Sequence, residues 1–68
     1  MSYLETHHVV GMTCDHCVRA VRAEVSAIEG VTDVDVDLIR RVVHVTAEQP
    51  VSTTAIREAV EEAGYTLA

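Results

Sequence analysis

The hydrophobic residues of this 68-residue chain change their spacing several times, and this change limits the possible folds more than any other feature. Apolar residues that alternate with polar ones indicate a strand with one buried face, whereas apolar residues three and four apart indicate a helix. Two helical segments begin at Asp15 and after Ser52. Four segments have the spacing or the position of strands: 3–10, 31–38, 43–47 and 65–68. The expected order of elements is therefore βαββαβ.

Both helical segments have one apolar face and end before a glycine, Gly30 in the first and Gly64 in the second. Ser52 is a suitable N-cap for the second helix. The two apolar faces consist of Val18, Val21, Val25 and Ile28, and of Ile56, Ala59, Val60 and Ala63. Helices of this kind bury their apolar faces against a sheet. We therefore expect an α+β, ferredoxin-like fold, in which two helices cover one face of a four-stranded antiparallel sheet.

Residues 1–68 are expected to form one domain, because compact domains rarely divide below about 100 residues. The chain has only two aromatic residues, so Val, Ile, Leu and Ala must form its core. A domain of this size does not enclose a deep substrate pocket, which argues against an enzyme.

The charge of the chain disfavours two classes of partner. Eleven acidic residues against five arginines, with no lysine, give a net charge of −6. Nucleic-acid binding depends on clustered cations, and anionic membranes repel acidic proteins, so neither partner is expected. The sequence contains no apolar run of about 20 residues and no signal peptide. We therefore expect a cytoplasmic protein without direct membrane insertion.

The two cysteines, Cys14 and Cys17, form a C-x-x-C pair. A disulfide across two intervening residues closes almost no loop and would stabilise the fold little. In a reducing cytosol the pair should remain as two thiols, which leaves metal binding and thiol redox chemistry as the possible roles.

The pair lies where the first strand leads into the first helix, with Cys14 in the loop and Cys17 in the opening helical turn. The helix N-terminus favours negative charge, so thiolates are expected at one exposed point. Two thiolates suit a soft monovalent ion in near-linear coordination, and Cu(I) is the leading candidate. A structural zinc site would need four ligands. A small dithiol redox protein is the alternative, since C-x-x-C also occurs in thioredoxin-like helices.

The segment Gly11-Met12-Thr13-Cys14-Asp15-His16-Cys17-Val18 resembles the GM-x-C-x-x-C motif of heavy-metal-associated domains. The similarity continues at Gly30-Val31, Val43-His44-Val45 and Ala63-Gly64-Tyr65. The chain is most similar to free-standing bacterial copper chaperones, and neither end suggests a tether. The resemblance implies that Cys14 and Cys17 bind Cu(I). It also implies transfer of the ion to the N-terminal metal-binding domain of a copper-transporting P-type ATPase.

Five further residues are expected near the metal. The resemblance implies that Met12 packs inward and that Tyr65 faces the ion, where a neutral hydroxyl can hydrogen-bond a thiolate. Thr13 occupies the position at which related zinc- and cadmium-handling domains have Asp, which favours Cu(I). Asp15 suits the first helical turn. His16 is expected to be an exposed residue that tunes local charge, with a third ligand as the alternative.

The chain also departs from the family. The hairpin turn near 39–42 lacks the usual Gly, and docking must use the arginines or the acidic surface because lysine is absent. The arginines are Arg19, Arg22, Arg40, Arg41 and Arg57. Zn, Cd, Ag or Hg as cargo, and a copper-bridged homodimer, remain open at this stage.

Overall fold

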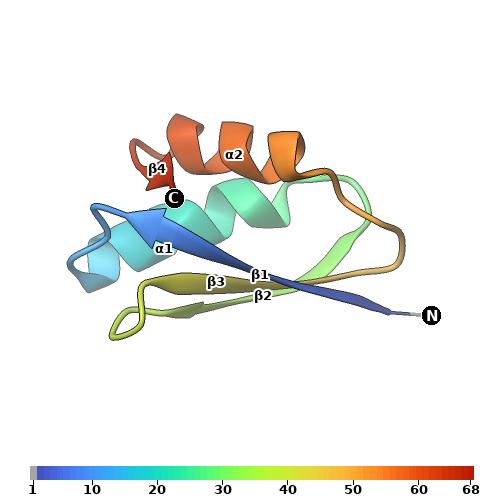
Figure 1. Ribbon diagram of the computed structural model, residues 1–68, viewed down its shortest axis with the longest axis horizontal. Helices are drawn as coiled ribbons and strands as arrows, with labels where there is room; N and C mark the ends of the chain where they lie inside the picture. The colour runs from blue at the N-terminus through green and yellow to red at the C-terminus, as the bar shows by residue number, and fades with distance from the viewer. Residues whose placement is uncertain (1) are drawn as a thin grey trace.

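The computed structural model describes residues 2–68, and it confirms the expected order of elements. The elements are β1 (Tyr3–Val10), α1 (Asp15–Ser26), β2 (Val31–Asp37), β3 (Val42–Ala47), α2 (Thr53–Glu62) and β4 (Thr66–Leu67). The four strands form one antiparallel sheet in the order β2-β3-β1-β4. Both helices cover the same face of this sheet (Figure 1). The ferredoxin-like α+β fold is therefore confirmed.

The strand register brings three connections to one end of the molecule. His8, near the end of β1, pairs with Val42 at the start of β3. Val10, the last residue of β1, pairs with Thr66 at the start of β4. The loop after β1, the turn between β2 and β3, and the loop before β4 therefore meet at this end (Figure 1). The C-x-x-C pair follows the first of these connections.

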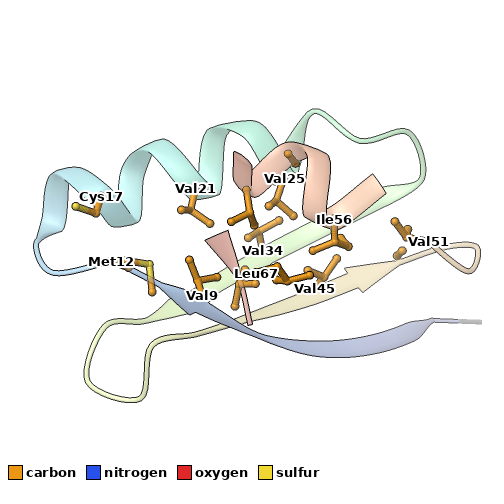
Figure 2. Close-up of a cluster of buried hydrophobic side chains, with 14 residues drawn as sticks. Val9, Met12, Cys17, Val21, Val25, Val34, Val45, Val51, Ile56 and Leu67 are labelled. Carbon is orange, nitrogen blue, oxygen red and sulfur yellow. The ribbon is translucent and has the colours of Figure 1, made fainter. Parts of the chain in front are cut away.

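The core lies between the helices and the sheet and consists mainly of valine (Figure 2). β-Branched side chains suit strands, and here they also form the buried stripes of both helices. The most deeply buried side chains are Val9, Met12, Val21, Val25, Val43, Val45, Ile56 and Val60. Ser52 caps α2 as expected, because its Oγ accepts a hydrogen bond from the Ala55 N–H at 3.1 Å.

Several element boundaries differ from the expected ones: β2 ends at Asp37, β3 begins at Val42 and β4 covers only Thr66–Leu67. Helix α1 ends at Ser26, although Ile28 still packs against the core. The N–H of Ala27 and that of Ile28 donate to the carbonyls three residues earlier, so the chain tightens into a turn before Gly30. The β2–β3 turn covers 38–41, and Arg41 takes the left-handed conformation (φ 58°) that glycine usually supplies. Within residues 2–68 no helix has the length and apolar character needed to cross a membrane.

We expect Ile56→Ala to lower the free energy of unfolding by about 2–5 kcal/mol, because Ile56 is completely buried and truncation leaves a cavity. Ile39→Ala is the matched control, since Ile39 is 94% exposed, and it should change stability by no more than about 0.5 kcal/mol. Urea denaturation measures both values. Equal destabilisation by the two substitutions would contradict the assigned core.

Candidate metal centre

The loop between β1 and α1 places the two cysteines on either side of a helix start. Gly11 has φ +92°, a conformation that other residues rarely adopt, and this lets the chain turn out of β1. Cys14 is the N-cap of α1 in an extended conformation, and its carbonyl accepts a hydrogen bond from the Val18 N–H at 3.2 Å. Cys17 follows within the first helical turn. Cys14 therefore belongs to the loop and Cys17 to the helix, as expected.

The two sulfur atoms lie close together but in different environments. Cys14 Sγ and Cys17 Sγ are 3.2 Å apart, and both are free thiols. Cys14 is exposed, whereas Cys17 is only 7% exposed and belongs to the core cluster. In Figure 2, Cys17 lies at one end of this cluster with its sulfur directed away from the valines.

The expectation that both cysteines are solvent-exposed was therefore wrong for Cys17. The sequence contained the signal, because Cys17 precedes Val21 by four residues and Val25 by eight. That spacing places Cys17 on the buried stripe of α1.

Tyr65 reaches the same point from the opposite end of the chain. Gly64 takes φ +96° after α2, and the Tyr65 N–H donates to the Val60 carbonyl at 3.1 Å, which is the bond of a Schellman motif. This ending directs Tyr65 back towards the β1–α1 loop. A side chain added at Gly11 would lie 3.5 Å from Tyr65 Cδ1, so the ring lies beside that glycine.

The surroundings of Cys17 favour its thiolate. Its pKa falls from 9.0 to about 6, first because the Tyr65 hydroxyl hydrogen-bonds its sulfur, and then because the Thr13 backbone and the Cys14 side chain do so. Burial opposes this change and only reduces it. The pKa of Tyr65 is raised, chiefly by the hydrogen bond to Cys17. At neutral pH the pair is therefore a thiolate beside a neutral phenol.

The other residues expected here divide into two groups. Met12 is completely buried, which agrees with inward packing. Thr13, Asp15 and His16 are exposed in the loop and the first turn of α1. Within residues 2–68, no group of three or more His, Cys, Asp or Glu side chains is arranged to hold a metal ion. The site therefore offers two sulfurs.

The distance between the two sulfur atoms shows how far they must move to bind an ion in linear coordination. Two metal–thiolate bonds of about 2.3 Å on a straight line would place the sulfurs about 4.6 Å apart. The observed 3.2 Å is shorter, so a near-linear ion requires the sulfurs to separate. Cys14 can make this movement, because it is exposed and lies outside the helix, while the backbone of Cys17 is fixed in α1.

Comparison with known proteins agrees with this geometry. The heavy-metal-associated domain family matches residues 6–66. The chain belongs to this family. The COP-associated protein of Helicobacter felis is 46% identical over 59 residues, which cover 87% of this chain and 89% of that protein. The copper chaperone CopZ of Bacillus subtilis is 40% identical over 65 residues, covering 94% of each chain.

Solved structures give the same relationship for this heavy-metal-associated domain. A CopZ metallochaperone superposes with a TM-score of 0.90 and is 34% identical, covering 97% of this chain and all of that one. The resemblance to free-standing copper chaperones is therefore confirmed over most of the chain. The expectation of a non-enzymatic protein is confirmed by these relatives, which are named as chaperones and not as enzymes.

We expect Tyr65→Phe to raise the pKa of Cys17 from about 6 towards 9.0, because it removes the largest contribution to the lowering. Alkylation requires the thiolate, whose fraction rises with pH, so the rate at pH 7 should fall in the variant. Iodoacetamide labelling from pH 5 to 9, with peptide mapping to Cys17, measures the midpoint. Tyr3→Phe is the control, because Tyr3 is the first residue of β1, at the opposite end of the strand from the cysteine loop. An equal pH midpoint of Cys17 labelling in the two variants would contradict the assigned effect of Tyr65.

Proposed function

We propose that this heavy-metal-associated domain is a cytoplasmic Cu(I) chaperone, with Cys14 and Cys17 as the ligands. The observation that carries the proposal is the pair of free sulfurs, 3.2 Å apart, at the N-terminus of α1. A reducing cytosol keeps such a pair as thiols, which is the state that binds metal. The copper chaperones among its relatives support the choice of cargo.

Copper in its cuprous form suits this site better than zinc does. Two soft thiolates satisfy Cu(I), whereas structural zinc takes four ligands. One Cu⁺ with two thiolates carries a net charge of −1, which the N-terminus of α1 stabilises. Thr13, in the position where related domains for divalent ions have Asp, adds no carboxylate.

The difference between the two cysteines suits transfer of the ion. A thiolate from the C-x-x-C pair of an acceptor adds to copper and gives a three-coordinate intermediate. The bond from copper to Cys14 then breaks first, because Cys14 is exposed and lies outside the helix. A second acceptor thiolate replaces Cys17 in the same way. Copper stays Cu(I) throughout, one bond to sulfur forms for each that breaks, and the ion is never free.

The neighbouring residues support this exchange without binding the ion. Met12 is a buried packing residue beneath the loop. Tyr65 hydrogen-bonds Cys17 and shields the copper with a neutral group. Asp15 stabilises the first helical turn, and His16 contributes exposed charge beside the site. The proposed acceptor is the N-terminal metal-binding domain of a copper-transporting P-type ATPase, and an exposed Cys14 also allows a copper-bridged homodimer.

We expect a Cys14→Ser, Cys17→Ser double variant to lose the single Cu(I) that the wild type binds, because a hydroxyl is a poor ligand for a soft ion. Met12→Leu, which conserves volume in the core, should retain full binding. Equilibrium competition with a Cu(I)-specific chelator measures the affinity of all three proteins.

X-ray absorption on the loaded wild type should give two or three sulfur neighbours at about 2.2–2.3 Å, the range of metal–thiolate bonds. Equal copper uptake by the wild type and the double variant would rule out the assigned ligands.

Thiol redox chemistry is the second candidate, because adjacent sulfurs and the lowered pKa of Cys17 also favour disulfide exchange. We expect no catalysis of insulin reduction by dithiothreitol, since a relative that is 40% identical over 94% of each chain is a copper chaperone. Cys14→Ser, Cys17→Ser provides the background rate. Turnover above that background, together with weak copper binding, would favour the redox function. Competition with Zn, Cd, Ag and Hg salts would identify a different cargo.

A further inference from the structure

The turn between β2 and β3, residues 38–41, presents an unusual group of side chains to solvent. Ile39 is 94% exposed, the largest exposed fraction among the large hydrophobic residues. The Arg40 side chain is 80% exposed, and Arg41 is exposed beside it. We call Ile39, Arg40 and Arg41 the hairpin tip.

The backbone of the hairpin tip is firmly held despite this exposure. Asp37 Oδ1 accepts a hydrogen bond from the Arg40 N–H at 3.0 Å, and the Arg41 carbonyl accepts one from the Val9 N–H at 2.8 Å. The Arg40 guanidinium approaches Asp37 only to 3.9 Å, and exposed ion pairs of this kind contribute little. The arginine charge therefore remains available to a partner.

Arg41 adopts a conformation that is costly for its residue type. At φ 58° it is left-handed, a region that glycine enters freely and other residues enter at a cost. Folding alone would favour glycine here, since the Arg41 side chain is exposed. Strain that local folding does not require is typical of functional positions.

The hairpin tip lies at the same end of the molecule as the cysteines. The Val9–Arg41 hydrogen bond joins it to the end of β1, two residues before Gly11. Figure 1 shows the β2–β3 turn and the loop leading into α1 at the same end of the sheet. The hairpin tip and the cysteine loop therefore both lie at the end of the molecule that a partner of Cys14 approaches.

Charge at the hairpin tip is opposite to that of most of the chain. The net charge is −6, and two of the five cations are adjacent here. Asp37 is the acidic side chain that contacts the hairpin tip, and others lie farther away, on β2 at Asp33 and Asp35 and along the groove between α1 and α2. That groove is lined by Glu24, Ala27, Ile28, Ala55, Glu58, Ala59 and Glu62.

We propose that the hairpin tip is a second docking contact, which inserts Ile39 into an apolar hollow on the acceptor protein and pairs Arg40 and Arg41 with carboxylates around it. The proposal rests on the proposed chaperone function and specifies the surface chemistry of its acceptor. An anionic membrane fits less well, because membrane recognition needs about four to eight clustered cations and the whole chain is acidic.

The test measures copper transfer from the loaded protein to the isolated N-terminal C-x-x-C domain of the copper-transporting ATPase of the same organism. Stopped-flow fluorescence with a labelled acceptor gives the rate. We expect Arg40→Glu to slow transfer about three- to tenfold at low salt, with the difference disappearing in about 0.5 M NaCl. Arg57→Glu, the same charge change in the middle of α2, should stay within about twofold of wild type. Ile39→Ser should slow transfer at both salt concentrations.

The substitution Arg41→Gly distinguishes a loss of docking from a loss of stability, because it should change the two in opposite directions. Glycine relieves the left-handed strain, so the urea midpoint should rise while transfer at low salt slows. Chelator competition on each variant must give wild-type copper affinity. A loss of affinity would assign the effect to the metal site and overturn the docking role.

The docking role of the hairpin tip would be overturned if all three variants, Arg40→Glu, Arg41→Gly and Ile39→Ser, transferred copper at the wild-type rate. The proposed chaperone function would then stand. Failure of the loaded wild type to transfer any copper would overturn both. Sedimentation with phosphatidylglycerol vesicles covers the membrane alternative. Arginine-dependent vesicle binding with unchanged transfer would assign the hairpin tip to lipid and overturn its protein partner.

Discussion

The packing of the first turn of α1 against the core is the constraint on which the metal centre depends. Cys17 lies on the same helical stripe as Val21 and Val25, so core packing fixes its position. Cys14, one turn earlier, is the N-cap and remains exposed. Of the two proposed ligands, one is therefore held and the other is free to move. The proposed carrier function needs this asymmetry, because a carrier must retain its ion in transit and release it on contact.

A second constraint is electrostatic: Tyr65, near the C-terminal end of the chain, acts on Cys17, near its N-terminal end. Tyr65 lowers the pKa of Cys17, and Cys17 in turn raises the pKa of Tyr65, so the thiolate is favoured beside a neutral phenol. The left-handed Gly64 that ends α2 makes this contact possible, because it returns the chain to the β1–α1 loop. The site thus favours an anionic sulfur through a neutral neighbour, because Tyr65 keeps its own proton.

The antiparallel register explains how so small a domain could combine the proposed metal site with the proposed docking contact. It collects the cysteine loop, the Tyr65 loop and the hairpin tip at one end, while the acidic groove lies between the helices. In the proposed docking, the small basic surface of the hairpin tip would orient an approaching acidic partner. Orientation matters here because exchange requires the two C-x-x-C pairs to meet directly.

Hydrophobic spacing predicted the βαββαβ order, Ser52 after Pro50 predicted the cap of α2, and the loop position of Cys14 predicted its exposure, since each depends on local geometry that a few neighbouring residues determine. The C-x-x-C pair and its position at a helix start likewise followed from the sequence. The early end of α1 and the left-handed Arg41 did not, because tertiary contacts outweigh local preference at such boundaries. The spacing of Cys17 from Val21 indicated that Cys17 lies on the buried stripe of α1. Only the folded structure shows which core residues cover it. The family resemblance, and not any local pattern, placed Tyr65 at the metal site, because Tyr65 and Cys17 are 48 positions apart in sequence and only the folded sheet brings them together.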